Sequence, residues 1–451
     1  MSLLPATEAL LVAGGDERIA LDPVSGLNKY GCPPRPDTTL LAFASSTASA
    51  VSVAGLAAAE TLRTRLLSAP AAHVHARELA RLQAELVALN GLDALPGLAV
   101  HIAESGTDAH RIAALQTLVG HSQPGLAIMV ESPETGSGVA TALEGAAHAN
   151  RRVEVRSVAL RLHDGSPRLR EAVDAEVAAL AEAAVRQDRP VLLVLADQSR
   201  TGLVAPSADC ALNLARRYPE HVAVLVDASQ FRLAPATLRA YLALDFMLCL
   251  TGSKFFGGPA FSGALLVPAG IARKTGRFPL EEINFGLLLR WEAALTSLRV
   301  FRTLPEAGVR QFMQAFSREM AARLAADPCL EALPVPVPDR LSAQTVESWD
   351  SEQSIFPFIL RDPDSGRPLG REQTLDIHRR LPVSAGASGP RCQLGQPVPC
   401  GEREGIPVSA LRLSLSADQI STALLTPEGA ASAIDQARQA LDKVAFLIRN
   451  G

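Results

Sequence analysis

The sequence predicts an α/β protein with a large domain on a parallel-rich mixed sheet and a smaller α+β domain at its carboxyl end. From about residue 98 to residue 268, short apolar runs alternate with helix-like segments, as in βα units. Fully apolar runs such as VAVLV (222–226) are typical of parallel strands covered on both faces. The 451 residues are also enough for two domains that share one active site.

Composition and charge narrow the functional class. The net charge is −4 and no basic stripe is present, which argues against nucleic-acid or anionic-membrane binding. Six scattered cysteines without paired metal-ligand spacing argue against a disulfide scaffold or a metal site, and fit a reducing cytoplasm. The first residues lack the features of a signal peptide, and no apolar run approaches the roughly 18 residues of a membrane span. We expect a cytoplasmic protein that binds no nucleic acid, membrane or metal.

The pattern along the chain divides it into an amino-terminal segment (1–60), a large domain (61–300) and a small carboxyl-terminal domain (301–451). Residues 26–36, GLNKYGCPPRP, are rich in turn formers and cannot form a long helix. The Ser-Ser-Thr cluster at 45–47 precedes an apolar helix, where its simplest role is an amino-terminal cap.

The stretch from 221 to 268 holds the strongest candidates for chemistry. A buried strand ends at Asp227, Gln230 follows one turn later, and a second buried strand precedes Lys254 in a turn rich in Ser and Gly. Catalytic groups gather at the carboxyl ends of such strands. Only four of the 43 basic residues are lysines, and a lysine can lose its proton and condense with an aldehyde, whereas an arginine cannot. A turn lysine without chemistry is the alternative for Lys254 alone.

A carboxylate at one strand end and a Schiff-base lysine on the next strand suit pyridoxal phosphate (PLP). Asp227 would keep the pyridine nitrogen protonated, so that the ring accepts electrons from a substrate carbanion, and Gln230 would donate to the phenolic oxygen. The motifs DASQ (227–230) and TGSKFFGGPAFSGALLV (251–267) resemble the Asp-x-x-Gln and Lys-x-x-Gly-Pro-x-x-x-Gly segments of fold-type I PLP enzymes. The resemblance is to the class V aminotransferase and cysteine desulfurase group.

This resemblance implies further site residues. Lys254 would carry PLP as a Schiff base, with Thr251 and Ser253 as neighbouring cofactor contacts. The amino-terminal segment would lie over the substrate side of the cofactor, which makes Tyr30 and the SSTAS run (45–49) candidate substrate contacts. The family also implies a homodimer with the active site at the subunit interface.

The turn SGTDA (105–109) is the second informative element. An apolar strand breaks at this turn and opens directly into a helix, whose backbone amides and neighbouring hydroxyls would cradle a phosphate. By itself the turn is an ordinary helix cap. It resembles the Gly-Thr-x-Ala loop of the family, which implies that Ser105, Gly106 and Thr107 hold the cofactor phosphate.

Two further strand ends match the family less closely. The strand at 126–131 would supply a histidine or aromatic ring that stacks on the cofactor, but this chain has Glu134 and Thr135 in that region. Three alternatives stay open here: Glu134 as an acid or base, the GSG run (136–138) as a site for an anionic group of the substrate, and a loop without chemistry. After the next strand, Ser199 or Asp197 would face the ring oxygen or the imine.

Two positions in the small domain also carry the resemblance. Arg412, in ALRLSLS, matches the arginine that family members use to bind the substrate α-carboxylate in a bidentate fork. Cys392, in SGPRCQLGQPV, resembles the desulfurase cysteine that accepts sulfur as a persulfide. The flanking Arg391 would lower the pKa of this thiol, or would instead bind a second carboxylate of the substrate.

Together these residues predict a PLP-dependent enzyme that acts on an amino acid or a 2-oxo acid. The substrate would displace Lys254, which then shuttles a proton as general acid and base. Transamination, as in a class V aminotransferase, is the first expectation because the desulfurase features are incomplete. A C–S or β-elimination lyase, including a cysteine desulfurase, is the alternative. A PLP-binding protein with a regulatory role is a third possibility, from another functional class.

Overall fold

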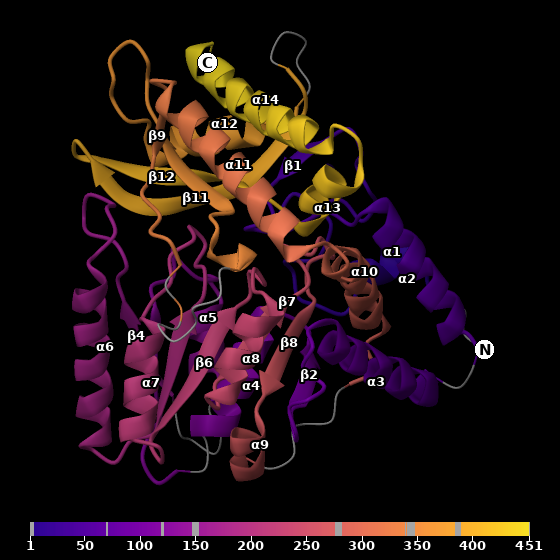
Figure 1. The fold of residues 1–451 in the computed structure, drawn as a ribbon, viewed down its shortest axis with the longest axis vertical. Coiled ribbons are helices and arrows are strands. Elements are labelled where there is room, and N and C mark those ends of the chain that lie inside the picture. The colour runs from indigo at the N-terminus through magenta and orange to yellow at the C-terminus, as the bar shows by residue number, and fades with distance from the viewer. Residues whose placement is uncertain are drawn as a thin grey trace.

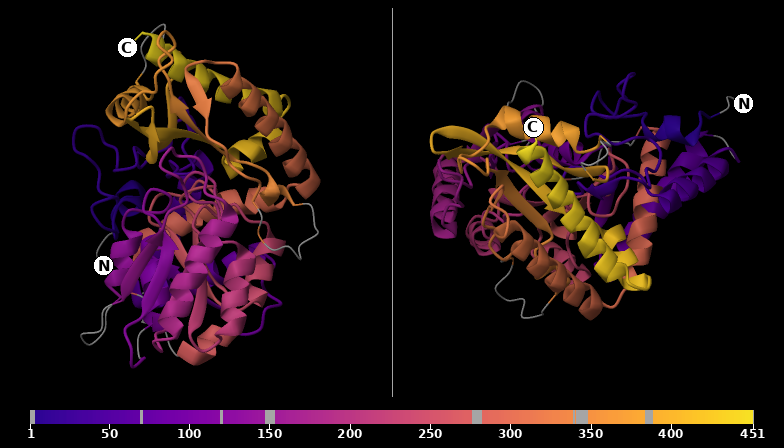
Figure 2. Two further views of the ribbon diagram at one scale, coloured as in Figure 1. Left: turned by 90° about the vertical axis from the view of Figure 1, so that its left-hand side faces the viewer. Right: turned by 90° about the horizontal axis from the view of Figure 1, so that it is seen from above.

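The computed structural model describes residues 4–68, 71–118, 121–146, 153–275, 282–338, 340, 348–383 and 389–450. They form two sheets with helices around both, and the smaller sheet lies above the larger one in Figure 1. The view turned by 90° about the vertical axis also shows the smaller sheet above the larger one (Figure 2, left). The expected combination of a parallel-rich mixed sheet and a smaller α+β unit is confirmed.

The larger sheet has seven strands in the order β2-β8-β7-β6-β5-β3-β4. These are β2 (Ala99–Ala103), β3 (Leu126–Val130), β4 (Glu154–Val158), β5 (Val191–Ala196), β6 (Val222–Ala228), β7 (Met247–Thr251) and β8 (Gly263–Val267). Of these strands, β8 runs antiparallel to β2 and β7, and the other pairs are parallel. Every residue of β3, β5, β7 and β8 is buried, because helices cover both faces of the sheet.

Helices pack on the sheet and beside its β2 edge. Those that follow the strands are α4 (Gly106–Leu118), α5 (Val139–Glu144), α6 (Arg170–Val185), α7 (Ala208–Arg217), α8 (Pro235–Ala243) and α9 (Ala269–Thr275). On the β2 side of the sheet, α3 (Ala71–Leu89) packs against β2 and against α10 (Phe285–Arg302), and α10 packs in turn against α1 (Thr7–Leu11) and α2 (Val53–Leu66) (Figure 1). Two ion pairs join α3 to α10, one between Arg81 and Glu292 and one between Arg299 and Glu85.

The smaller sheet has the order β1-β11-β12-β10-β9. Its strands are β1 (Leu41–Phe43), β9 (Leu330–Ala332), β10 (Ile355–Leu360), β11 (Cys392–Arg403) and β12 (Ile406–Ser414). Its helices are α11 (Glu306–Ala325), α12 (Arg371–Arg380), α13 (Ala417–Leu425) and α14 (Gly429–Arg449), with the short turn η1 (Trp349–Ser351). β1 pairs parallel with β11, so the amino-terminal segment adds a strand to this sheet.

An aromatic cluster fills the core near the end of β7. Phe255 stacks on Trp349 at 5.6 Å between ring centroids, and Phe256 meets Phe301 edge to face at 5.7 Å. Both phenylalanines are buried, so the turn that contains Lys254 is anchored in the core by the two residues that follow it. Among the described helices, none is both long and apolar enough to cross a membrane.

Candidate active site

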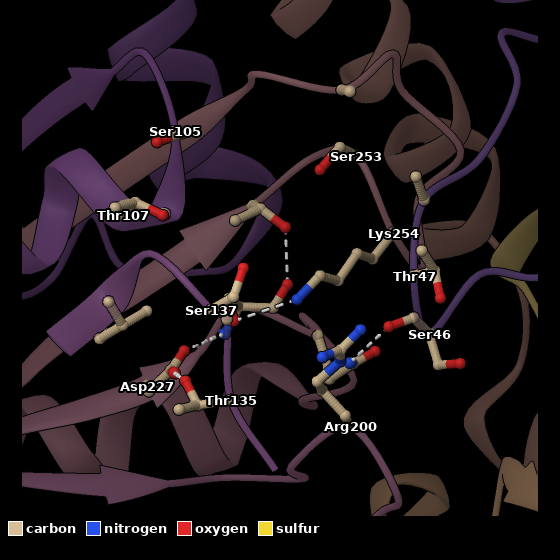
Figure 3. Close-up of a pocket in the computed structure, with 18 of the residues that line it drawn as sticks. Ser46, Thr47, Ser105, Thr107, Thr135, Ser137, Arg200, Asp227, Ser253 and Lys254 are labelled. Atoms are coloured by element: carbon tan, nitrogen blue, oxygen red, sulfur yellow. Dashed lines mark hydrogen bonds between the residues drawn. The ribbon is translucent and has the colours of Figure 1, made fainter. Parts of the chain in front are cut away.

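A cavity of about 190 Å³ lies at the carboxyl ends of β5, β6 and β7 (Figure 3). Its wall also includes residues of the amino-terminal segment and Gln396 of β11, so both sheets contribute to it. The sequence-predicted residues that line it are Tyr30, Ser105, Gly106, Thr107, Ser199, Asp227, Gln230, Thr251, Ser253 and Lys254. The structure therefore brings together most of the predicted site residues, although they lie far apart in sequence.

The turn after β7 holds Lys254 with its amine inside this cavity. The backbone of the turn is fixed by Ser49, whose N–H donates to the carbonyl of Ser253 at 2.9 Å and whose hydroxyl donates to that of Lys254 at 2.8 Å. The Nζ atom donates to Ser229 Oγ at 3.3 Å. Burial lowers the pKa of Lys254 from 10.5 to about 8, although the charge of Asp227 acts in the opposite direction. Much of the amine is therefore neutral at mildly alkaline pH.

Asp227 is the last residue but one of β6 and forms a buried pair with His110 of α4. His110 Nε2 lies 3.4 Å from Asp227 Oδ2, while its Nδ1–H donates to the carbonyl of Gly106 at 2.7 Å. Burial disfavours the negative charge of Asp227 and the positive charge of His110. The attraction between the two opposite charges is larger than this effect of burial. The pKa of Asp227 is therefore held below its usual range and that of His110 well above it. Thr135 donates to Asp227 Oδ2 at 3.4 Å and Ser229 N–H to Oδ1 at 3.1 Å, so the carboxylate is ionised and fixed in place.

The amino terminus of α4 forms another part of the cavity wall. Ser105 caps the helix: its Oγ accepts from Asp108 N–H at 3.2 Å and donates to Asp108 Oδ2 at 2.7 Å. A Cβ at Gly263 would lie 2.3 Å from the carbonyl carbon of Ser105, so only glycine lets β8 approach this turn so closely. Gly106 and Thr107 begin the helix beside the cavity, where its free backbone amides and dipole favour an anion.

Comparison with known proteins identifies the fold. No family model and no curated protein sequence matches the chain. Among solved structures, the cystine C–S lyase C-DES, in complex with its reaction product cysteine persulfide, is 17% identical with a TM-score of 0.58, over 89% of this chain and 98% of that one. The cysteine desulfurase CsdA from Escherichia coli is 14% identical with a TM-score of 0.54, over 91% and 95%. TDC from Oryza sativa, with PLP and tryptamine, is 12% identical with a TM-score of 0.56, over 91% and 83%.

The chain has the fold of fold-type I PLP enzymes. The donor set of the cavity also fits that cofactor. Lys254 offers an amine to an aldehyde, Asp227 offers an ionised carboxylate to a ring nitrogen, and the α4 terminus offers amides to a phosphate. His110, which the sequence interpretation missed, supports the carboxylate from behind. The one signal for it was its position four residues after Gly106, on the same face of the helix.

Three predicted cofactor contacts line the cavity and already donate hydrogen bonds to the protein. The Gln230 amide donates to the carbonyl of Ser46 at 3.0 Å. Ser199 donates its hydroxyl to Glu134 at 2.7 Å, and Thr251 donates its own to the carbonyl of Ser229 at 2.6 Å. A hydroxyl has a single hydrogen, so a cofactor contact donated by Ser199 or Thr251 would require an existing bond to be exchanged. The Gln230 amide has a second hydrogen and keeps one donor.

The acidic residues near the ends of β3 and β5 are structural in this arrangement. Glu134, considered as an acid or base, is buried and accepts hydrogen bonds from Arg161 Nε at 2.7 Å and from the hydroxyl of Thr201. Asp197, considered as a contact to the ring, is buried and forms an ion pair with Arg340 at 2.8 Å. Both carboxylates are therefore held by an arginine of the protein.

The expectation that Arg391 lowers the thiol pKa of Cys392 is wrong. Cys392 is buried in β11, its Sγ lies 3.9 Å from the carbonyl of Leu381, and burial raises its pKa to about 12. Arg391 instead pairs with Asp37 at 2.9 Å and donates to the carbonyl of Pro382 at 2.9 Å. Neither residue lines the cavity, so the roles of Cys392 in sulfur transfer and of Arg391 in binding a second carboxylate lose their geometric basis.

The place of Arg412 also differs from the expectation. Its guanidinium is buried behind the cavity wall, and both terminal nitrogens already have protein acceptors. Nη1 donates to the carbonyls of Ser46 at 3.4 Å and Arg200 at 3.0 Å. Nη2 donates to Thr47 Oγ1 at 2.7 Å and to the carbonyl of Gln396 at 2.6 Å. The two terminal nitrogens that were expected to bind a substrate carboxylate are therefore occupied by protein acceptors, whereas Nε is buried without a partner among the described residues.

Proposed function

We propose that this chain is a PLP-dependent enzyme that acts on amino acids, with the cofactor attached to Nζ of Lys254. The observation that carries the proposal is the pairing, in one cavity, of an enclosed lysine amine with the ionised carboxylate of Asp227, next to the α4 amino terminus. These are the partners that the aldehyde, ring nitrogen and phosphate of PLP require. Similar folds solved with PLP support the proposal.

The chain's own residues would divide the work in the following way. When bound, PLP supplies a ring that withdraws electrons from the substrate Cα. Asp227, kept ionised by His110, would hold a proton at the ring nitrogen. The amine of Lys254, whose pKa is about 8, gains and loses a proton readily near neutral pH, which suits proton transfer at the substrate Cα. Ser229 Oγ would orient the amine through its hydrogen bond.

Transamination between an amino acid and a 2-oxo acid is the reaction we propose. None of the six cysteines, all of which lie in described segments, lines the cavity, so a persulfide relay on a cysteine has no support there. A C–S or β-elimination lyase is the second candidate, because such a reaction needs no cysteine of the enzyme and the fold is similar to that of C-DES. The family resemblance and the composition further support a cytoplasmic homodimer whose active site lies at the subunit interface.

Reductive trapping and product analysis test this proposal. The purified protein is loaded with PLP and reduced with borohydride, and peptide mapping then locates the added mass, which we expect on Lys254. A panel of amino acids is next incubated with the loaded protein. A 2-oxo acid that retains the substrate carbon skeleton, together with pyridoxamine phosphate, supports transamination, whereas sulfide or ammonia with a shortened side chain supports a lyase. PLP on Lys254 without any product supports a binding or regulatory role, and mass on any other residue refutes the site.

A further inference from the structure

Arg200 is a cavity residue that the sequence interpretation did not select. It lies in the turn after β5 and lines the same cavity as Lys254 (Figure 3). Its backbone is fixed at both ends of the residue, because its N–H donates to the carbonyl of Glu134 at 2.8 Å and its own carbonyl accepts from Arg412 at 3.0 Å. Within the described ranges, its guanidinium has no hydrogen-bond or ion-pair partner.

The acids that line the cavity form ion pairs with other cations, and although the charge of Glu134 acts on Arg200, no described hydrogen bond or ion pair joins the two side chains. Glu134 is paired with Arg161, and Asp227 with His110. A partly buried guanidinium without an acceptor is costly, and an anionic ligand would remove that cost. Besides Lys254 and His110, two other basic residues line the wall, and neither offers a fork without a partner as Arg200 does. Arg18 is paired with Asp16 at 2.7 Å, and Lys29 lacks the planar fork that fits a carboxylate.

Arg412 cannot easily turn toward the cavity to replace Arg200 in this role. A Cβ at Gly395 would lie 3.1 Å from Arg412 Cζ, so the guanidinium is packed tightly against the β11 backbone. Its bonds to Thr47 and Gln396 would also have to break, and both of these residues belong to the cavity wall. Arg412 is thus a support behind the wall, and Arg200 is on its inner face.

We propose that Arg200 binds the α-carboxylate of the substrate through a bidentate pair of N–H···O bonds. This inference rests on the function proposed above and names the residue that orients the amino acid there. Because Lys254 and Arg200 line one small cavity, an amino acid whose amine reaches the group attached at Lys254 brings its adjacent carboxylate toward Arg200. The planar fork of arginine matches a carboxylate in both geometry and charge.

The test compares two ligands that differ in the carboxylate alone, L-alanine and L-alaninamide. Each is titrated into the PLP-loaded protein, and half-saturation is followed by the change in the visible absorption of the cofactor. We expect wild-type protein to prefer alanine by about 10- to 100-fold, the factor expected of a charge-assisted hydrogen-bonded pair. Arg200→Gln should abolish the preference while the response to alaninamide stays. Arg200→Lys should restore part of it, because the charge returns without the fork.

A matched control loses the same charge elsewhere. Arg217→Gln removes an exposed arginine at the end of α7 and should keep the wild-type preference. As a readout without turnover, propionate should raise the Tm of the loaded wild-type protein more than propionamide does, and Arg200→Gln should remove this difference. If Arg200→Gln keeps the preference, or if wild-type protein shows none, the assignment of Arg200 is overturned. If borohydride fixes no PLP on Lys254 in wild-type protein, the proposed function fails, and this inference fails with it.

Discussion

Replacing Lys254 with methionine should stabilise the cofactor-free protein near neutral pH. Enclosure lowers the pKa of this lysine from 10.5 to about 8, so its charged form is less favourable in the native state than in the unfolded chain. At pH values below about 8, the pKa of Lys254 in the folded protein, the charged amine lowers the free energy of unfolding by the full amount. This destabilisation disappears as the pH rises from that value toward 10.5, the pKa in the unfolded chain. Since one pKa unit corresponds to about 1.4 kcal/mol, the charged amine destabilises the folded protein by about 3 kcal/mol at about pH 7. At about pH 9.5 this destabilisation is smaller by about 2 kcal/mol.

Urea unfolding of wild type and Lys254→Met at these two pH values measures the difference. The variant should be more stable at the lower pH, and its advantage should shrink at the higher one. Lys274→Met, the same change at an exposed lysine of α9, controls for the loss of a lysine in general. An advantage of Lys254→Met that is equally large at both pH values would refute the reasoning, because a change in packing does not follow the titration of an amine.

Three further predictions concern the residues around the cavity. His110→Phe should let the pKa of Asp227 rise toward its usual range, so that the affinity for PLP falls by about 10-fold on mild acidification. A dissociation constant of PLP from this variant that does not change with pH would contradict this prediction. Arg161→Met should destabilise the protein by about 3–5 kcal/mol in urea unfolding, because the carboxylate of Glu134 stays buried without its cation, and a companion Glu134→Gln change should recover part of the loss. Cys392→Ala should cost about 1 kcal/mol of stability and leave turnover unchanged, and lost turnover with PLP still bound would restore the sulfur-transfer hypothesis.

The parts of the fold and site that could be predicted are those encoded locally. The apolar runs of β5, β6 and β7 are each followed within a few residues by polar groups, so parallel pairing alone brings Asp227 and Lys254 to one edge. The turn at Ser105 carries its own cap and glycine, and its place beside the same edge follows from the pairing of β2 with β8. The division of the chain at residues 60 and 300 stays a prediction.

The parts that could not be predicted depend on contacts between distant segments. Whether Arg412 faces the cavity is decided by acceptors near residues 46 and 200, which no local pattern reveals. Arg391 precedes β11 and pairs with Asp37, a residue far away in sequence, so its charge does not act on the buried thiol of Cys392. β1 is three residues long, too short for an alternation of apolar and polar residues to be recognised.

The stretch from Ser46 to Ser49 forms hydrogen bonds to the part of the chain around the larger sheet and to the smaller sheet. Within four residues it bonds to the turn of Lys254, to the amide of Gln230 and to the guanidinium of Arg412. An insertion or deletion inside it would move the reactive amine relative to the small sheet. We therefore expect length differences among natural variants of this chain to fall outside the stretch. A permuted chain opened between these serines should lose its cavity even if every helix and strand still forms.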